Sequence, residues 1–271
     1  TPELFALHVS RFASESGVEI VGGCCGTLPE HIKALSDSVA KISSGRRKGA
    51  EIIHASASLY KSQSYAITPK PLIIGERTNV SGSSKFREAF LAENYEAMTE
   101  TALDQEKEGA HMLDLSLAYA GKDETAVMEK MVKKLAIDLQ IPLCIDSTDP
   151  VIIETAMKNY GGKMLINSIN LEDGGVKAEK VLDLIKEYGA SVIALTIDEQ
   201  GMAKTCERKM EVAERLLELT RRKGISDGDV FIDTLTFTLG SGDVTLKNAA
   251  VETLNAIKKI REKHPGVKTV L

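Results

Sequence analysis

Six short apolar runs recur between residues 72 and 233, and each of them ends in a carboxylate or an amide. Runs rich in Ile, Leu and Val that are separated by helical patterns are typical of buried parallel strands. Their polar last residues would meet at the carboxyl end of the sheet, where β/α barrels carry their chemistry. Such an edge suits a flat ligand rich in nitrogen and oxygen. The run-ending residues are Asn79 (with Glu76 before it), Asp114, Asp146, Asn167, Asp198 and Asp233.

Amphipathic helical patterns alternate with these runs, and a seventh apolar run begins at Val267. This alternation predicts an α/β fold with a parallel sheet. A closed TIM-type (β/α)8 barrel needs eight units, so we expect a barrel that is incomplete at its C-terminal end. The helical patterns cover about 86–108, 123–139, 149–159, 176–188, 205–223 and 244–263.

Three segments are predicted along the chain. Residues 1–43 read as helix, strand, turn and helix, with a short strand at 18–21. Residues 44–70 lack a clear period and are interpreted as a linker or a wrapping arm, and residues 71–271 contain the barrel. A segment of 43 residues cannot bury a core by itself. The chain is therefore expected to be an internal fragment of a longer protein.

Composition excludes several classes of function. Hydrophobic residues make up 43% of the chain and the net charge is -5, which favours a packed globular protein without a nucleic-acid footprint. No apolar stretch is long enough to span a bilayer, and no signal-peptide pattern is visible. The four cysteines show no disulfide framework, which indicates a reducing compartment and predicts a cytoplasmic protein.

Cys24 and Cys25 stand between a predicted strand and a predicted helix. A helix N-terminus favours the thiolate form, and zinc binds thiolates tetrahedrally. The alternative is a pair of small core residues, because free cysteine often fills apolar space. Two thiolates alone do not make a zinc site, so the spacing leaves both interpretations open.

The segment 22–32, Gly-Gly-Cys-Cys-Gly-Thr-Leu-Pro-Glu-His-Ile, resembles the closing segment of the barrel in zinc-dependent homocysteine methyltransferases. In that family the paired cysteines are two of three thiolate ligands, and zinc activates the sulfur of homocysteine. The resemblance implies that Cys24 and Cys25 bind zinc, and that residues 1–43 are the last βα unit of a homocysteine-binding barrel. Cys144 and Cys206 do not match the third ligand.

A second resemblance covers about 200 residues. The segment 74–87, Ile-Gly-Glu-Arg-Thr-Asn-Val-Ser-Gly-Ser-Ser-Lys-Phe-Arg, is similar to the opening of the pterin-binding barrel of cobalamin-dependent methionine synthases, a barrel of the dihydropteroate-synthase type. The strand ends 113–115, 144–148, 166–170 and 231–233 match the same family in the same order. A homocysteine-barrel tail followed by a pterin barrel is also that family's domain order.

This resemblance implies a methyltransferase of methionine biosynthesis. The parent protein would move a methyl group from 5-methyltetrahydrofolate to cob(I)alamin, and from methylcobalamin to zinc-bound homocysteine. The products would be methionine and tetrahydrofolate. The chain would carry the folate-binding part, and its partners would be these small molecules and a cobalamin-binding domain of the same parent.

The resemblance also implies residue roles. Asp146, Asn167 and Asp233 would hold the pterin through its amino and ring N–H groups, since carboxylates accept hydrogen bonds and an amide can do both. Asn167 would lie near N5, which must gain a proton or a strong hydrogen bond before the methyl group leaves. Asp114 would join Asn167 in catalysis, as part of a network that delivers this proton, and Glu76 is a second candidate for that network.

The remaining folate contacts are expected on the first strand and the loop after it. They are Asn79, Ser83, Ser84 and Lys85. Several candidates have a structural alternative. Ser83 to Lys85 also read as a polar loop and helix start, Asp146 and Asp233 as rim carboxylates that accept backbone N–H groups, and Asp198 as a turn cap.

Three rival functions stay open. A dihydropteroate-synthase-like enzyme should carry Thr-Pro-Asp-Ser-Phe after the first-strand Asn79, whereas this chain has Val80-Ser81-Gly82-Ser83. Folate:corrinoid-protein methyltransferases share the pterin barrel but lack the homocysteine segment. The third rival is a non-catalytic folate-binding module. The chain also departs from the family after Asp233, where Thr234-Leu235 replaces the frequent Pro-Asn.

Overall fold

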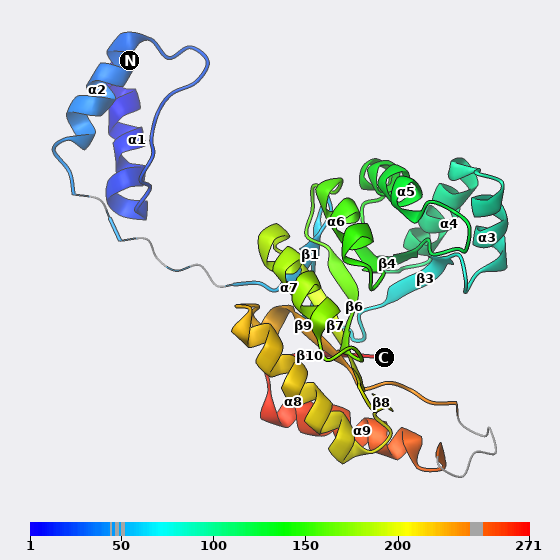
Figure 1. Cartoon of the computed structure of the whole chain (residues 1–271). Helices are drawn as coiled ribbons and strands as arrows, with labels where there is room; N and C mark the ends of the chain where they lie inside the picture. The colour runs from blue at the N-terminus through cyan, green and yellow to red at the C-terminus, as the bar shows by residue number, and fades with distance from the viewer. Residues whose placement is uncertain (44, 47–48, 50–51, 239–245) are drawn as a thin grey trace. The chain divides into compact units, whose positions relative to one another are not determined.

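The computed structural model describes residues 1–43, 45–46, 49, 52–238 and 246–271. Two compact units follow one another along the chain, Thr1–Ile53 and His54–Leu271. Figure 1 shows the elements of both units. Because no helix in the described ranges is both long and apolar enough, none of them could cross a membrane.

The first unit is a helical hairpin of α1 (Pro2–Ser16) and α2 (Pro29–Val39). Thr1 caps α1 through its side chain, and Gly17 ends that helix with φ 67°. A glycine suits that position because it adopts positive φ without a steric cost. The strand predicted at residues 18–21 is wrong, since this segment has no regular structure and Ile20 is 91% exposed. A parallel strand needs a neighbouring strand, and the described part of this unit offers none.

In its described residues, the second unit is built on seven parallel strands that curl as a partial barrel. Their order in the sheet is β10, β9, β7, β6, β5, β4 and β3, and the short β8 (Gly201–Met202) pairs with β7 in the antiparallel sense. The incomplete TIM-type α/β barrel predicted from the apolar runs is therefore confirmed. The parallel strands are β3 (Ile74–Asn79), β4 (Met112–Ser116), β5 (Leu143–Asp146), β6 (Leu165–Leu171), β7 (Ser191–Asp198), β9 (Val230–Asp233) and β10 (Lys268–Val270).

Helices follow the strands in alternation and cover the outer face of the sheet. The single helix predicted at 86–108 is wrong in one respect, because two helices, α3 and α4, replace it. Glu93 between them has φ 53°, and the Asn94 side chain caps the second helix by accepting from the Ala97 N–H. The helices are α3 (Ser84–Leu91), α4 (Tyr95–Lys107), α5 (Glu124–Asp138), α6 (Pro150–Lys158), α7 (Val176–Tyr188), α8 (Cys206–Arg222) and α9 (Ala249–Lys263), with a 3-10 turn η1 (Asp227–Asp229) before β9.

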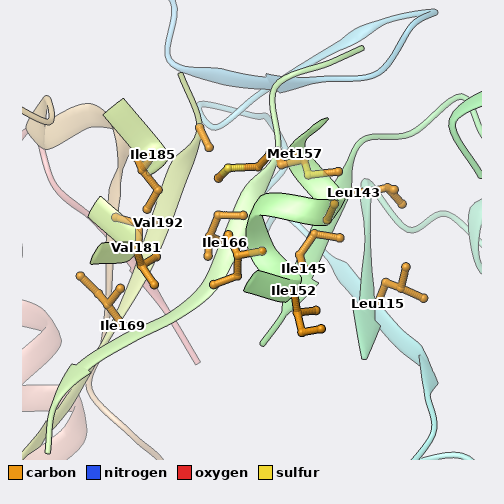
Figure 2. Close-up of a cluster of buried hydrophobic side chains, with 14 of the residues drawn as sticks. Leu115, Leu143, Ile145, Ile152, Met157, Ile166, Ile169, Val181, Ile185 and Val192 are labelled. Carbon is orange, nitrogen blue, oxygen red and sulfur yellow. The ribbon is translucent and has the colours of Figure 1, made fainter. Parts of the chain in front are cut away.

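The main core lies between the sheet and these helices. Ile145, Ile166 and Val192 point outward from adjacent strands and are almost completely buried. Ile152 on α6 and Val181 on α7 meet them from the helical layer (Figure 2). Burying each such side chain contributes about 1.5–3 kcal/mol. Successive strand residues alternate between faces, so the outward apolar side chains leave the polar strand ends on the inner face.

The predicted linker 44–70 contains a β-hairpin, β1 (Ala55–Ala57) and β2 (Ser62–Ser64), which belongs to the same unit as the sheet. Tyr65 follows it and is buried at the amino end of the strands. Its hydroxyl lies 2.7 Å from Ser56 Oγ and donates to Ser191 Oγ at 2.7 Å. Ser191 in turn donates to Asp229 Oδ1 at 2.9 Å. The hairpin is thus joined to the barrel by a buried polar network.

We expect Tyr65→Phe to lower the free energy of unfolding by about 1–2 kcal/mol, because Ser56 and Ser191 lose a buried hydrogen-bond partner. Both serines are 0% exposed, so water cannot replace the hydroxyl. Urea denaturation would measure the change. Tyr119→Phe is a matched control, since Tyr119 is 40% exposed. Equal stability of the Tyr65 and Tyr119 variants would contradict the role of the network.

Candidate pterin site at the carboxyl end of the sheet

The carboxyl ends of the strands line a small cavity on the inner face of the sheet. Its polar lining comes from Glu76 on β3, Asp114 on β4, Asn167 on β6 and Asp233 on β9. Four of the predicted site residues therefore lie together, although up to 157 positions separate them in sequence. The other lining residues are Leu72, Ile74, Cys144, Ile193, Val270 and Leu271. Several hydrogen-bonding groups among apolar walls are typical of a small-molecule site.

Asp114 is the most perturbed carboxyl group of the cavity. It is only 3% exposed, and it accepts a hydrogen bond from Asn167 Nδ2 at 3.3 Å. Burial, together with the nearby charge of Asp146, raises the pKa of Asp114 to about 7, although hydrogen bonds from Cys144 and Asn167 oppose the shift. A carboxyl group with this pKa exists in both protonation states near neutral pH. It can therefore give or take a proton under physiological conditions.

Asp146 and Asn79 form the adjoining part of the site. Asn79 Nδ2 lies 3.4 Å from Asp146 Oδ2, and Asp146 is paired in register with Asn167 across β5 and β6. Burial raises the pKa of Asp146, and a hydrogen bond with Ser116 opposes this shift. Asn79 also accepts the N–H groups of Ser81 and Gly82 at 2.8 and 2.9 Å. Its amide thus shapes the turn after β3 and is bound to a site carboxylate as well.

Asp233 ends β9 on the same cavity. Burial raises its pKa, whereas the N–H of Leu235 and the charge of Lys209 oppose the shift. The Leu235 N–H donates to Asp233 Oδ1 at 2.6 Å. The departure from the family at Thr234-Leu235 therefore falls on a backbone segment that contacts the site carboxylate directly.

Ser83, Ser84 and Lys85 line a neighbouring hollow with Glu76 and Asn79. Ser83 Oγ accepts the Phe86 N–H at 3.3 Å and caps α3, as the structural alternative requires. Lys85 Nζ lies 3.8 Å from Asp104 in an exposed ion pair. Their contact with a folate tail stays a prediction.

Asp198 does not belong to the cavity. Its buried carboxylate pairs with Arg208 and with Arg215, the latter at 2.7 Å, and Asp198 Oδ1 accepts the Gln200 N–H at 3.1 Å. The turn-capping alternative considered for this residue is thus the one observed. Both carboxylate oxygens already have partners, so Asp198 is not a candidate for binding the pterin.

Cys24 and Cys25 are exposed in the turn that precedes α2. The Cys24 N–H donates to Thr27 Oγ1 at 3.1 Å, and the Thr27 N–H donates to the Cys24 carbonyl at 3.0 Å. Within the described ranges no group of three His, Cys, Asp or Glu side chains is arranged to hold a metal ion. Thiolates have the right chemistry for zinc, but these two do not complete a site.

Cys144 and Lys209 are site neighbours that the sequence analysis did not identify. Cys144 is fully buried on β5, lines the cavity and hydrogen-bonds Asp114. The sequence placed it in an apolar run and in the matched strand end 144–148 and did not match it to the third zinc ligand, but gave it no role beside the pterin. Lys209 stands on α8, three residues before the buried Val212, and a lysine on an apolar helical face was the available signal.

Comparison with known proteins finds two different families along this chain, one in each part. The Pterin binding enzyme family matches residues 75–270, and the Homocysteine S-methyltransferase family matches residues 1–39. Methionine synthase from Mycobacterium tuberculosis is 39% identical over 274 residues, and methionine synthase from Mycobacterium leprae is 40% identical over 279. All of this chain aligns in both cases, but it spans only 23% of the length of each relative.

Solved structures of low sequence identity share the fold. Dihydropteroate synthase from Xanthomonas albilineans, in complex with indole-2-carboxylic acid and 6-chloroguanine, superposes with a TM-score of 0.54 at 17% identity. That superposition covers 75% of this chain and 73% of the other. Dihydropteroate synthase from Stenotrophomonas maltophilia gives a TM-score of 0.52 at 18% identity, over 74% and 71% of the two chains. Since the Pterin binding enzyme match spans more than half of its residues, this chain belongs to the pterin binding enzyme family.

Proposed function

We propose that this chain is the folate-binding part of a methyltransferase that makes methionine. Its pterin site would bind 5-methyltetrahydrofolate and release tetrahydrofolate, and the methyl group would pass to a cobalamin and then to homocysteine. The cavity that joins Asp114, Asn167 and Asp233 is the observation that carries this proposal. The similarity to two methionine synthases, which covers all of this chain and 23% of each relative, supports the choice of reaction.

The chemistry of the cavity fits a pterin. The amino-pyrimidinone edge of a pterin offers several N–H donors beside a carbonyl acceptor. Asp233 and Asp146 can accept from such donors, and Asn167 can donate and accept at once. The raised pKa of both carboxyl groups comes mainly from burial, so a ligand that donates hydrogen bonds to them would lower it again.

Methyl transfer from N5 needs a positive or strongly hydrogen-bonded nitrogen, because an unprotonated N5 would have to leave as an amide anion, which is a poor leaving group. When cob(I)alamin is bound by another domain, it supplies the nucleophile that takes the methyl group. In this chain Asn167 would stabilise the protonated N5, and Asp114 would hold the proton that reaches it, with water as the carrier. Their contact at 3.3 Å links the two groups.

The first unit would complete the proposed cycle at the homocysteine end. Its family match and the exposed Cys24-Cys25 pair fit two of the three thiolate ligands of a zinc ion. Zinc, when bound, would lower the pKa of the homocysteine thiol and favour its thiolate. In this homocysteine half of the cycle, the first unit would supply these two sulfurs.

This chain by itself should bind zinc weakly. Because two thiolates leave the tetrahedral set incomplete, we expect a dissociation constant above about 1 µM, whereas complete structural sites bind with about 10–16 kcal/mol. Competition with a chromogenic chelator would measure it, with Cys24→Ser as the variant for comparison. Tight stoichiometric zinc in the purified chain would refute this expectation.

The rivals differ from the proposal in testable ways. A folate:corrinoid-protein methyltransferase would have no use for the homocysteine-type segment at residues 1–39. A dihydropteroate-synthase-like enzyme would condense a pterin with an aminobenzoate and would not consume 5-methyltetrahydrofolate. A non-catalytic module would bind the folate and leave added cob(I)alamin unmethylated.

The decisive experiment titrates 5-methyltetrahydrofolate into the protein by calorimetry and then adds cob(I)alamin. The proposal expects binding at a single site and conversion of cob(I)alamin to its methylated form, which absorption spectroscopy follows. Binding without methyl transfer would favour the non-catalytic module. Absence of binding by the folded protein would reject the folate function.

A further inference from the structure

Lys209 is a fully buried lysine on the sheet-facing side of α8. It shares this side with Val212, Ala213 and Leu216, which are also buried. Removing an ammonium group from water is costly unless hydrogen bonds and countercharges compensate. An apolar side chain would fill the position at lower cost, so the partners of the ammonium group indicate what the lysine does.

Among the described residues, the close partners of the ammonium group lie in the segment that follows Asp233. Lys209 Nζ donates to the carbonyl of Thr234 and, at 3.4 Å, to that of Leu235. It also stands 4.9 Å from the centroid of the Phe237 ring, within the range of a cation–π interaction. The ammonium group thus contacts the backbone and one ring of residues 234–237.

The same segment holds the site carboxylate. Leu235 has φ 59°, a left-handed conformation that is unfavourable for residues other than glycine. Its N–H points to Asp233 Oδ1 at 2.6 Å, while its carbonyl accepts from Lys209 and from Thr253 Oγ1, the latter at 2.8 Å. The Lys209 bond to the Thr234 carbonyl holds the peptide unit that carries the Leu235 N–H, and the bonds of Lys209 and Thr253 to the Leu235 carbonyl hold the peptide unit that follows it.

We propose that Lys209 is a positioning residue that fixes the Asp233 carboxylate as an acceptor for the amino and ring N–H edge of the pterin. The inference rests on the proposed pterin function and extends it to a residue outside the cavity. Lys209 acts in two ways, through the backbone of residues 234–235 and through its charge. Thr253 acts in the first way only, because it carries no charge.

Burial and nearby charged groups shift the pKa of both Lys209 and Asp233. Burial lowers the pKa of Lys209, while Asp233, Glu252 on α9 and Cys206 on α8 oppose that shift. For Asp233, burial and the charge of Glu76 on β3 raise the pKa, and Lys209 lowers it. Without the ammonium group, the pKa of Asp233 should rise further, so its carboxylate form would be lost at a higher pH.

The test compares Lys209→Met with the wild type in calorimetric titrations of 5-methyltetrahydrofolate from about pH 5 to about pH 8. Methionine keeps the apolar length of the side chain and removes the ammonium group. We expect affinity about tenfold weaker at neutral pH. The acid limb of the binding profile, which is the pH range where affinity falls as the pH is lowered, should shift to higher pH. Lys209→Arg restores the positive charge and should return the acid limb toward that of the wild type.

Two further variants separate this role from stability. Lys163→Met removes a lysine paired with Asp229 at the amino end of the strands, so it should bind the folate like the wild type with an unchanged pH profile. Thr253→Val removes one hydrogen bond to Leu235 and should weaken binding about threefold without moving the acid limb. If Lys209→Met does not fold, the affinity of Thr253→Val decides, and an unchanged value would overturn the inference.

The outcomes distinguish this inference from the function on which it rests. A folded Lys209→Met variant with wild-type affinity and pH profile would overturn the role of Lys209, while folate binding by the wild type would still stand. A wild type that binds no folate would reject both. Weakened binding with an unmoved acid limb would reject the part played by the charge and keep the positioning through the backbone.

Discussion

Replacing Asn167 by alanine is expected to weaken 5-methyltetrahydrofolate binding about 10- to 100-fold, since one or two buried hydrogen bonds to the pterin would be lost. Methyl transfer should slow by about 10²–10³, the usual cost of removing a group that stabilises charge in the transition state. Calorimetry would give the affinity, and single-turnover methylation of cob(I)alamin would give the rate. These effects are the largest on catalysis that the cavity supports.

The position of Asn167 explains why one side chain should have both effects. Its Nδ2 donates to Asp114 Oδ1 at 3.3 Å, so the amide is oriented by the most perturbed carboxyl group of the site. An oriented amide presents its oxygen in a fixed direction, where it can accept from a protonated nitrogen. The alanine variant would lose this acceptor and leave Asp114 with one partner fewer.

Asn255→Ala is the matched control for this experiment, because Asn255 is exposed on α9 and lines neither the site cavity nor the neighbouring hollow. It should leave both affinity and rate unchanged. If Asn167→Ala weakened neither, while the wild type bound and reacted, the pterin would have to lie elsewhere on the protein. If only affinity fell, Asn167 would hold the ring without assisting the departure of the methyl group.

The barrel could be predicted from the sequence because each strand carries its own signal. An apolar run that ends in a polar residue is a local pattern, and the order of such runs gives the parallel sheet. The strand expected at residues 18–21 failed for the opposite reason. Val18 and Ile20 satisfy the local pattern, but a strand also needs a neighbour that composition does not reveal.

The sequence predicts those site residues that stand near the carboxyl ends of strands. Glu76, Asp114, Asn167 and Asp233 reach one cavity because parallel strands share a carboxyl edge. Asp198 obeys the same rule but is occupied by two arginines from the next helix, a tertiary contact with no local signature. Lys209 was missed because its function depends on which loop carbonyls lie above its helix.

Asp114→Asn is expected to stabilise the protein above neutral pH, by about 4 kcal/mol at most. Burial raises the pKa of Asp114 from 3.8 to about 7, so folding costs free energy wherever the unfolded chain carries the charge and the folded one must bury it. Each unit of this difference corresponds to about 1.4 kcal/mol. In the wild type, the stability that the protonated Asp114 contributes is fully present below about pH 3.8, its pKa in the unfolded chain. This stability is lost as the pH rises, and the loss is complete just above the folded pKa of about 7.

Denaturant unfolding at several pH values would test this expectation. The stability gain of the variant should be near zero in acid and should grow toward pH 8, whereas Asp183→Asn, a change at an exposed carboxylate, should alter stability by less than about 1 kcal/mol at any pH. A gain that is constant with pH would show that Asp114 does not titrate as proposed. Methyl transfer should fall by about 10² in the same variant, because asparagine cannot hold the transferable proton. Higher stability with lower activity would mark Asp114 as a group retained for chemistry at a cost in folding free energy.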